Sequence, residues 1–143
     1  ALVCTKKAEA QSDDTNMPMV VLTGGEPSLQ ADEALIDALH AAGFAFIAME
    51  SNGTHEPPRG IDWLTVSPKE QPVVTHCSEL KVLFDNVQPV STHGITAEHY
   101  FLQPLDTGDT TKNHTILAHC VDYLLTHPQW RMSLQTHKLM GIR

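Results

Sequence analysis

The sequence predicts an α/β fold, a partial (β/α) barrel built mostly from parallel strands. Several short apolar runs end abruptly in Gly or Ser loops, as the buried strands of a parallel sheet do. A strand, an amphipathic helix and a second strand follow one another within about 30 residues, the length of a βαβ unit. Polar side chains also gather directly after the expected strands, where the ligand sites of α/β folds form.

The first unit spans residues 19–53. Residues 19–23 form a Val-rich run that stops at Gly24-Gly25, and residues 44–49 form a second apolar run before the turn-prone Ser51-Asn52-Gly53. Between the two runs, residues 31–42 place apolar side chains on one helical face, and a glycine follows as a C-terminal cap (Leu35, Ile36, Leu39 and Gly43). This region is therefore expected to be strand, helix, strand.

The remaining strands are expected at residues 63–67, 79–84, 100–103 and 131–137. A helix before the last strand is indicated by Leu117, Cys120, Val121 and Leu124, and Pro128 ends it. Residues 1–16 are polar and read as a loop, or as the remnant of a longer N-terminal segment. We expect residues 1–143 to form a single domain.

Composition limits the possible functions. Lys and Arg number 9 against 17 Asp and Glu, a net charge of −8, which disfavours binding to nucleic acid or to an anionic membrane. No apolar run approaches the roughly 20 residues of a membrane-spanning helix, and no signal-peptide pattern opens the chain. These features favour a cytoplasmic protein with a small-molecule ligand.

The three cysteines, Cys4, Cys77 and Cys120, are far apart and match neither a disulfide framework nor a CxxC metal site. We expect two buried thiols and one in the N-terminal stretch. A zinc site built from His76-Cys77 and His119-Cys120 is a weaker alternative, because adjacent ligands point in different directions. The sequence therefore assigns no metal ligands.

Polar residues at the ends of the expected strands are the main functional signal. Parallel strands end at the same edge, so these side chains should meet on one rim. They are Thr23, Gly24, Gly25 and Glu26 after the first strand, Glu50 and Asn52 after the second, Ser67 and Lys69 after the third, Gln103 and Asp106 after the fifth, and Gln135 and His137 at the last.

Each of these residues also has a purely structural interpretation. Gly24-Gly25 can be a tight turn, and phosphate binding there is disfavoured because no GxGxxG or Walker pattern follows and Glu26 would repel a phosphate. Taken alone, Glu50 and Asn52 are about as consistent with a loop cap and a turn as with a ligand site. The repetition across five strand ends favours a ligand site.

Six segments together resemble a known family. They are VVLTGGEP at 20–27, ESNGTH at 50–55, TVSPK at 65–69, ELKV at 79–82, FLQPLD at 101–106 and HPQWRMSLQTHKLMGIR at 127–143. In order and spacing they are similar to the 7-carboxy-7-deazaguanine synthase family of radical S-adenosylmethionine enzymes, across residues 17–143. The first segment alone is moderately specific, whereas SPK, QPLD and QTHK together are strongly specific.

The resemblance implies a radical S-adenosylmethionine lyase that uses a [4Fe-4S] cluster and Mg²⁺. It would convert 6-carboxy-5,6,7,8-tetrahydropterin to 7-carboxy-7-deazaguanine, with loss of ammonia, in queuosine biosynthesis. It also implies a homodimer and a reductant such as flavodoxin. Carried over by position, it assigns S-adenosylmethionine to Gly24, Gly25, Glu26, Glu50, Asn52, Ser67, Pro68, Lys69, Gln103, Pro104, Leu105 and Asp106, and the pterin to Thr23, His137 and Arg143, with no catalytic residue assigned.

The sequence departs from the family at one point. The three-cysteine cluster motif, the neighbouring Thr that helps bind Mg²⁺ and an early Gln-Gly-Glu stretch do not occur in it. We expect the cluster and Mg²⁺ ligands in a missing N-terminal segment, and favour a fragment over a degenerate paralogue. The alternatives are a cluster-free module that binds S-adenosylmethionine or a pterin, and another radical enzyme such as a glycyl-radical activase.

Overall fold

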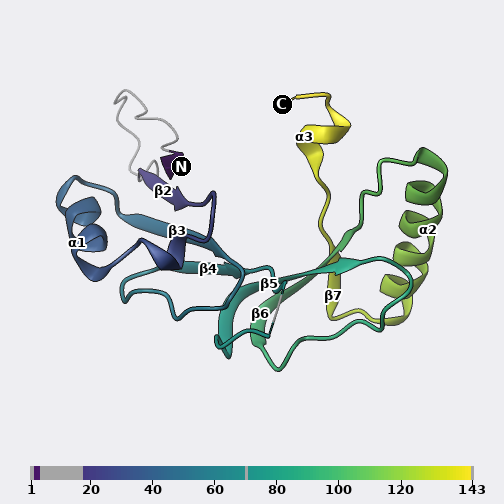
Figure 1. The fold of residues 1–143 in the computed structure, drawn as a ribbon, viewed down its shortest axis with the longest axis horizontal. Helices are drawn as coiled ribbons and strands as arrows, with labels where there is room; N and C mark the ends of the chain where they lie inside the picture. Colours follow the sequence, from purple (N-terminus) through teal and green to yellow (C-terminus); the bar gives the residue numbers. More distant parts are fainter. Residues whose placement is uncertain (1, 4–17, 70, 143) are drawn as a thin grey trace.

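The computed structural model describes residues 2–3, 18–69 and 71–142, and its strands form one sheet in chain order (Figure 1). Strands β2 to β7 pair in parallel, and β1 pairs antiparallel with β2. The prediction of an α/β fold with a mostly parallel sheet is confirmed. The strands are β1 (Leu2–Val3), β2 (Met19–Leu22), β3 (Phe46–Ser51), β4 (Trp63–Val66), β5 (His76–Phe84), β6 (Thr96–Pro104) and β7 (Trp130–Met132).

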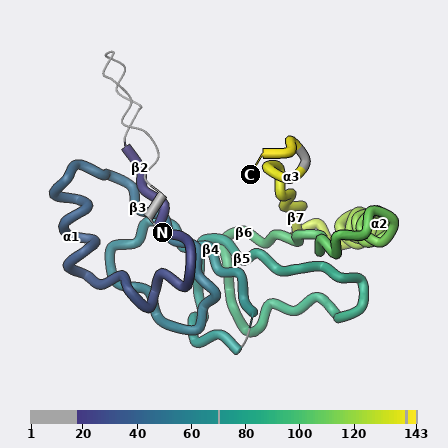
Figure 2. Tube along the Cα trace, turned by 45° about the horizontal axis from the view of Figure 1, so that its top comes forward, coloured from purple at the N-terminus to yellow at the C-terminus, as the bar shows by residue number. Residues whose placement is uncertain are grey.

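Two long helices connect neighbouring parallel strands. Helix α1 (Glu33–Ala41) joins β2 to β3, and α2 (Thr110–Thr126) joins β6 to β7. Each begins at an aspartate whose side chain accepts backbone N–H groups, Asp32 for α1 and Asp109 for α2. Because parallel crossovers share one hand, both helices cover the same face of the sheet, and Figure 2 shows them at its two ends.

The covered face carries the hydrophobic core. Alternate strand residues pack there against the helices, and the Phe84 and Tyr123 rings lie 5.8 Å apart. Helix α2 buries Ile116 and Cys120, whereas Leu117 and Val121, which were expected to share the buried face, remain 37% and 42% exposed. The most deeply buried side chains are Val20, Ile36, Ile47, Met49, Val66, Leu80, Leu102 and Cys120.

The opposite face, here called the inner face, carries the other half of each strand. Paired residues of parallel neighbours point to the same side, so the register assigns a mixed polar and apolar set to this face. No helix of the described chain belongs to the core on that side. The inner-face residues include Met19, Val21, Phe46, Ala48, Glu50, Trp63, Thr65, Glu79, Lys81, Leu83, His99, Phe101, Gln103 and Arg131.

Three crossovers in the middle of the sheet contain no described helix: residues 52–62, 67–75 and 85–95. The first two are held together at Gly53, whose carbonyl accepts hydrogen bonds from the Val73 and Val74 N–H groups at 2.8 and 3.2 Å. The strand–helix–strand repeat therefore holds only at the two ends of the sheet.

The last predicted strand, 131–137, is wrong in its second half. Strand β7 ends at Met132, and His137 lies in the short helix α3 (Thr136–Leu139). Its partner β6 ends at Pro104, which has no N–H group, so the ladder does not continue beyond the bond from Ser133 N–H to the Leu102 carbonyl. The alternation expected to place His137 beside Arg131 on one strand face is therefore absent.

Residues 1–16 were expected to be a loop, but residues 2–3 form β1, with Leu2 paired to Leu22 and Val3 to Val21. The rest of that segment lies outside the described residues. Among the described helices, none is both long enough and apolar enough to cross a membrane.

Candidate functional site

A pocket of about 230 Å³ lies at the carboxyl ends of β2, β3 and β4. We call it the rim pocket. It brings together eight of the residues predicted from strand ends, and it adds one, Ser51, that the sequence did not single out. Pro68 is not among the lining residues, which are Thr23, Gly24, Gly25, Glu26, Glu50, Ser51, Asn52, Ser67 and Lys69.

The carboxylate of Glu26 joins two of these loops. Its Oε1 accepts hydrogen bonds from Ser28 Oγ at 2.6 Å and Ser51 Oγ at 2.7 Å, and its Oε2 accepts one from Asn52 N–H at 2.7 Å. Ser28 N–H donates a further bond at 3.2 Å, which caps the short 3₁₀ helix η1 (Pro27–Leu29). Glu26 thus ties the loop after β2 to the end of β3.

These hydrogen bonds favour the charged form of Glu26. Burial alone would raise the pKa of this carboxyl, but the bonds from Ser28, Asn52 and Ser51 together outweigh burial and hold the pKa below its ordinary value. The Glu26 side chain is therefore an anion at neutral pH, and both of its oxygens accept hydrogen bonds from within the protein. It is suited to shaping the rim pocket, while backbone carbonyls nearby are left to meet a ligand.

The turn after β3 is fixed by its own side chains. Buried Ser51 accepts from Gly53 N–H at 3.0 Å, and Asn52 Oδ1 accepts from Thr54 N–H at 2.9 Å and Thr54 Oγ1 at 2.7 Å. Ser51 also accepts Ser67 N–H at its carbonyl, 2.8 Å away, which joins the ends of β3 and β4. The sequence signal for Ser51 was its position at the end of a strand. It was missed because a serine at that position is also typical of an ordinary turn.

Thr23 and Glu50 face the same pocket. The Thr23 hydroxyl donates to the exposed Glu50 carboxylate at 3.4 Å, a long bond that leaves both groups available to a ligand. Gly24 has φ +121°, a conformation that favours glycine, whereas a Cβ at Gly25 would meet no other atom within 4 Å. Gly25 therefore borders open space, and the pocket approaches its backbone directly.

A second pocket of about 250 Å³ lies beyond β5, between the end of β6, α2 and the segment after β7. It contains three of the residues that the family resemblance assigned to the cofactor, Pro104, Leu105 and Asp106. Asp106 accepts from Lys138 Nζ at 2.6 Å and Asn113 Nδ2 at 2.7 Å, and the Lys138 contact is the main reason that its pKa lies well below the ordinary range. The other lining residues are Asn113, Leu117, Ser133, Leu134, Gln135 and Lys138.

Among the described residues, three of the predicted ones line neither pocket: Pro68, Gln103 and His137. Gln103 is half-buried on the inner face of β6, and His137 is exposed on α3. Arg143 lies outside the described residues. The structure therefore divides the predicted rim into two groups separated by β5, rather than one continuous cluster.

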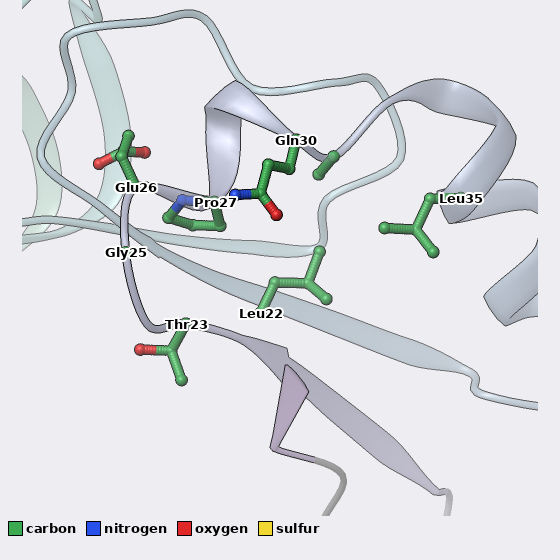
Figure 3. Close-up of a pocket in the computed structure, with 8 residues that line it drawn as sticks. Leu22, Thr23, Gly25, Glu26, Pro27, Gln30 and Leu35 are labelled. Atoms are coloured by element: carbon green, nitrogen blue, oxygen red, sulfur yellow. The ribbon is translucent and has the colours of Figure 1, made fainter. Parts of the chain in front are cut away.

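A further pocket of about 200 Å³ lies behind the Gly24–Glu26 loop (Figure 3). Leu22, Ala31 and Leu35 form the apolar part of its wall, and Gln30 supplies an amide. In Figure 3 the Glu26 carboxylate and the Thr23 hydroxyl point away from Leu35, so the polar chemistry of this loop faces the rim pocket.

The sequence also missed a polar group on the inner face: Thr65, Glu79 and Lys81. The Lys81 Nζ and Glu79 Oε1 atoms lie 3.8 Å apart, with side-chain exposures of 22% and 20%. Thr65, buried, pairs with Glu79 in the register. The signal was the alternation along residues 76–84, where Leu80, Val82 and Phe84 enter the core and Glu79 and Lys81 face the other way.

No group of three or more potential ligands for a metal ion occurs among the described residues. Cys77 is half-buried and packs against the hydrophobic core, and burial raises the pKa of its thiol to about 11. Cys120 is buried in the core by α2, and burial also raises its pKa. Both cysteines belong to the core region, but among the described residues no group of three or more potential ligands joins them to His76 or His119 in the zinc site considered as an alternative.

Several curated proteins that share one name are similar to the chain. No protein-family model matches the chain. The chain is 53% identical over 127 residues to the 7-carboxy-7-deazaguanine synthase of Bordetella pertussis, covering 86% of the chain and 59% of that protein. It is 49% identical over 128 residues to the synthase of Bradyrhizobium diazoefficiens, covering 87% of the chain and 59% of the relative.

The synthase of Bacteroides thetaiotaomicron is 47% identical over 127 residues, with 87% of the chain and 65% of the relative covered. The chain thus spans about three fifths of the length of the curated relatives it matches. Identity near one half across most of its residues, together with the strand-end residues gathered in the rim pocket, shows that the chain belongs to the 7-carboxy-7-deazaguanine synthase family.

Proposed function

We propose that this chain carries the S-adenosylmethionine-binding rim of an enzyme that makes 7-carboxy-7-deazaguanine, in queuosine biosynthesis. The substrate would be 6-carboxy-5,6,7,8-tetrahydropterin, which loses ammonia. One observation carries the proposal: the rim pocket unites strand-end residues from β2, β3 and β4 in a chain about half identical to proteins of that name.

The rim pocket fits the polar parts of S-adenosylmethionine. The ligand's ammonium group needs acceptors, which the backbone carbonyls of Gly24 and Gly25 supply beside open space. Lys69 on the far side of the pocket can offset the methionyl carboxylate, with Ser67 as a neutral donor. The exposed Glu50 carboxylate can accept from both ribose hydroxyls, as acidic residues do at dinucleotide sites.

The second pocket is the proposed place for the rest of this cofactor. We keep S-adenosylmethionine assigned to Gln103, Pro104, Leu105 and Asp106, although Asp106 is already paired with Lys138. When bound at a reduced cluster, S-adenosylmethionine supplies hydrogen-atom abstraction. Thr23, next to Glu50, is the proposed pterin contact at the junction between cofactor and substrate.

The described residues do not fit a [4Fe-4S] cluster or a Mg²⁺ site, because they include no set of three thiolates or carboxylates that could surround a metal. We therefore assign no chemical role to Cys77 or Cys120. A homodimer, a reductant such as flavodoxin and a cytoplasmic location complete the proposal.

Gly25→Val tests the cofactor site in the complete protein that carries this sequence, with its cofactors reconstituted. The new side chain has room in the folded protein but occupies the space assigned to S-adenosylmethionine. We expect its affinity for S-adenosylmethionine to fall about tenfold or more while the midpoint of urea unfolding is unchanged. Ala45→Val, at an exposed position before β3, is the matched control and should change neither quantity.

Turnover separates the proposal from its alternatives. With S-adenosylmethionine and a reductant, the complete protein should convert the carboxylated pterin to 7-carboxy-7-deazaguanine. Binding of S-adenosylmethionine or pterin without turnover would favour a cluster-free binding module. Cleavage of S-adenosylmethionine with no effect of the pterin would favour a different radical enzyme, such as a glycyl-radical activase.

A further inference from the structure

The Asn52-Gly53 pair, directly after β3, is the kind of dipeptide that is most prone to spontaneous deamidation. A glycine after asparagine has no side chain to shield its backbone nitrogen, and its backbone turns easily. In this reaction the Gly53 nitrogen loses its proton to solvent and attacks Asn52 Cγ, which forms a C–N bond, closes a five-membered succinimide and releases ammonia. Water then opens the ring and leaves aspartate or isoaspartate at position 52.

The structure holds the two reacting groups on different partners. The Gly53 N–H group, which must lose its proton before the nitrogen can attack, donates to Ser51 Oγ at 3.0 Å. Asn52 Oδ1 accepts from Thr54 N–H at 2.9 Å and from Thr54 Oγ1 at 2.7 Å, which holds the side-chain amide toward Thr54. Both reactants are therefore bound in the folded protein, and neither is bound to the other.

Glu26 fixes the direction of the Ser51 hydroxyl. Ser51 Oγ donates its one proton to Glu26 Oε1 at 2.7 Å, so a lone pair of the same oxygen remains for Gly53 N–H. Glu26 Oε2 accepts from Asn52 N–H at 2.7 Å, which fixes the peptide on the other side of Asn52. Ser51 and Gly53 are both buried, so water does not readily replace these partners.

The surroundings of Gly53 leave little room for the reaction or for its products. Its carbonyl accepts from the Val73 and Val74 N–H groups, and a Cβ at Gly53 would lie only 2.9 Å from Val66 Cγ1. Isoaspartate would lengthen the main chain by one carbon at this place. Either product would also add a carboxylate next to that of Glu26, so deamidation would damage the rim pocket.

We propose that Asn52 is a latent modification site and that Ser51 is the positioning residue that protects it from deamidation. The hydrogen bonds from Gly53 to Ser51 and from Ser51 to Glu26 keep the Gly53 nitrogen away from the Asn52 amide. The protection itself does not depend on the proposed function. Its consequence does, because the loop that deamidation would alter borders the pocket assigned to S-adenosylmethionine.

The test incubates the complete protein near physiological pH and temperature and follows position 52 by peptide mass spectrometry, which separates asparagine, aspartate and isoaspartate. Ser51→Ala should raise the deamidation rate about tenfold, because Gly53 N–H loses its partner and the segment opens more often. Thr54→Val, which removes one of the two hydrogen bonds to Asn52 Oδ1, should raise the rate by less.

Ser91→Ala is the matched control. Ser91 Oγ accepts the N–H of His93, two residues further along, at 3.0 Å, the same kind of bond that Ser51 makes with Gly53. Ser91→Ala should leave the rate at position 52 unchanged. Ile116→Val removes a methyl group from the core beside α2 and lowers the global stability, and it should leave the rate in the folded protein unchanged as well.

The wild-type protein provides a measurement that needs no variant. Unfolded in urea, it should deamidate at position 52 at least about tenfold faster than when folded, because the hydrogen bonds of Ser51 and Thr54 are then absent. Equal rates in the folded and unfolded protein overturn the protection. A rate in Ser51→Ala equal to that of the wild type, or equal to that of Ile116→Val, overturns the role of Ser51. No ligand is present, so these results are distinct from those of the binding and turnover experiments that test the proposed function.

Discussion

At the scale of single residues, Glu26 shows how one carboxylate can organise the loops of the rim pocket. The sequence placed it at the rim, and the structure shows its carboxylate holding Ser28, Ser51 and Asn52. Its role in our interpretation is to fix the loop whose backbone carbonyls face the rim pocket. Glu26→Gln should therefore weaken the hydrogen bonds that hold this loop in place, without removing a direct contact to a ligand.

We expect Glu26→Gln to lower the free energy of unfolding at neutral pH by about 1 to 3 kcal/mol, because an amide meets donors that now face a carboxylate. The folded-state pKa of Glu26 is depressed, so its stabilising effect is present above the unfolded pKa of about 4.3 and is lost as the pH falls through the folded value. Urea unfolding from pH 7 to pH 3 should show the difference between the two proteins shrinking with acid. Glu56→Gln, exposed, is the control; a constant difference at all pH values would contradict this account.

Gly53 allows a comparison between two glycines of similar conformation. Gly53 has φ +77°, and a Cβ there would lie 2.9 Å from Val66 Cγ1 and 3.1 Å from Pro72 Cβ, whereas Gly94, at φ +80°, has nothing within 4 Å. Gly94→Ala should cost about 1 to 2 kcal/mol of unfolding free energy, the conformational term alone. Gly53→Ala should cost more, because the two short crossovers meet there. Equal losses in urea unfolding would show that the contacts are easily relieved.

At the scale of elements, the sequence predicted strands and helices correctly where a strand is followed by a helix. It failed where pairing with a distant strand decides whether a segment forms a strand. The runs at 19–23 and 44–49 and the helix between them were found because period and caps agree. The residues from 133 to 137 alternate like a strand, yet β6 gives them no ladder beyond Leu102. The ladder stops there because of Pro104 in the partner strand. The alternating pattern of residues 133–137 carries no information about that proline.

Helix α3 is too short to be stable alone, and the Asp106–Lys138 pair at 2.6 Å connects it to the loop after β6. Both groups are accessible to solvent, so the pair should order this segment more than it stabilises the whole protein. Lys138→Met should speed hydrogen exchange at residues 136–142 several-fold and leave the thermal midpoint nearly unchanged. Lys112→Met is the matched control, and unchanged exchange at 136–142 would show that α3 is held by other contacts.

At the scale of the whole molecule, the strand-end residues gather at the carboxyl edge of the sheet as expected, but they form two groups instead of one. Parallel strands ending at one edge were enough to bring Thr23, Glu50 and Ser67 into the rim pocket. Strand ends alone do not report what lies between them, and β5 carries Leu83, 55% exposed, and Phe84 at its end rather than a polar ligand group. The sheet therefore carries two pockets at this edge, and β5 lies between them.

A cofactor that spans both regions should leave a specific pattern of protection. Because the rim pocket and the pocket lined by Pro104, Leu105 and Asp106 sit on opposite sides of β5, S-adenosylmethionine bound across them must contact both. Hydrogen exchange in the complete protein should then slow together at residues 23–27, 50–54 and 67–69 and at residues 103–106, at the same cofactor concentration, because one binding event protects all four segments.

Residues 91–95, which lead into the amino end of β6, provide the internal control and should keep their exchange rates, since they lie at the other edge of the sheet. Protection confined to the first three segments would mean that the cofactor stays on β2, β3 and β4, and that the Gln103–Asp106 stretch should be removed from the site. In the Gly25→Val protein both regions should lose protection together, even though the substitution touches only one of them, because a single bound molecule connects the two pockets across β5.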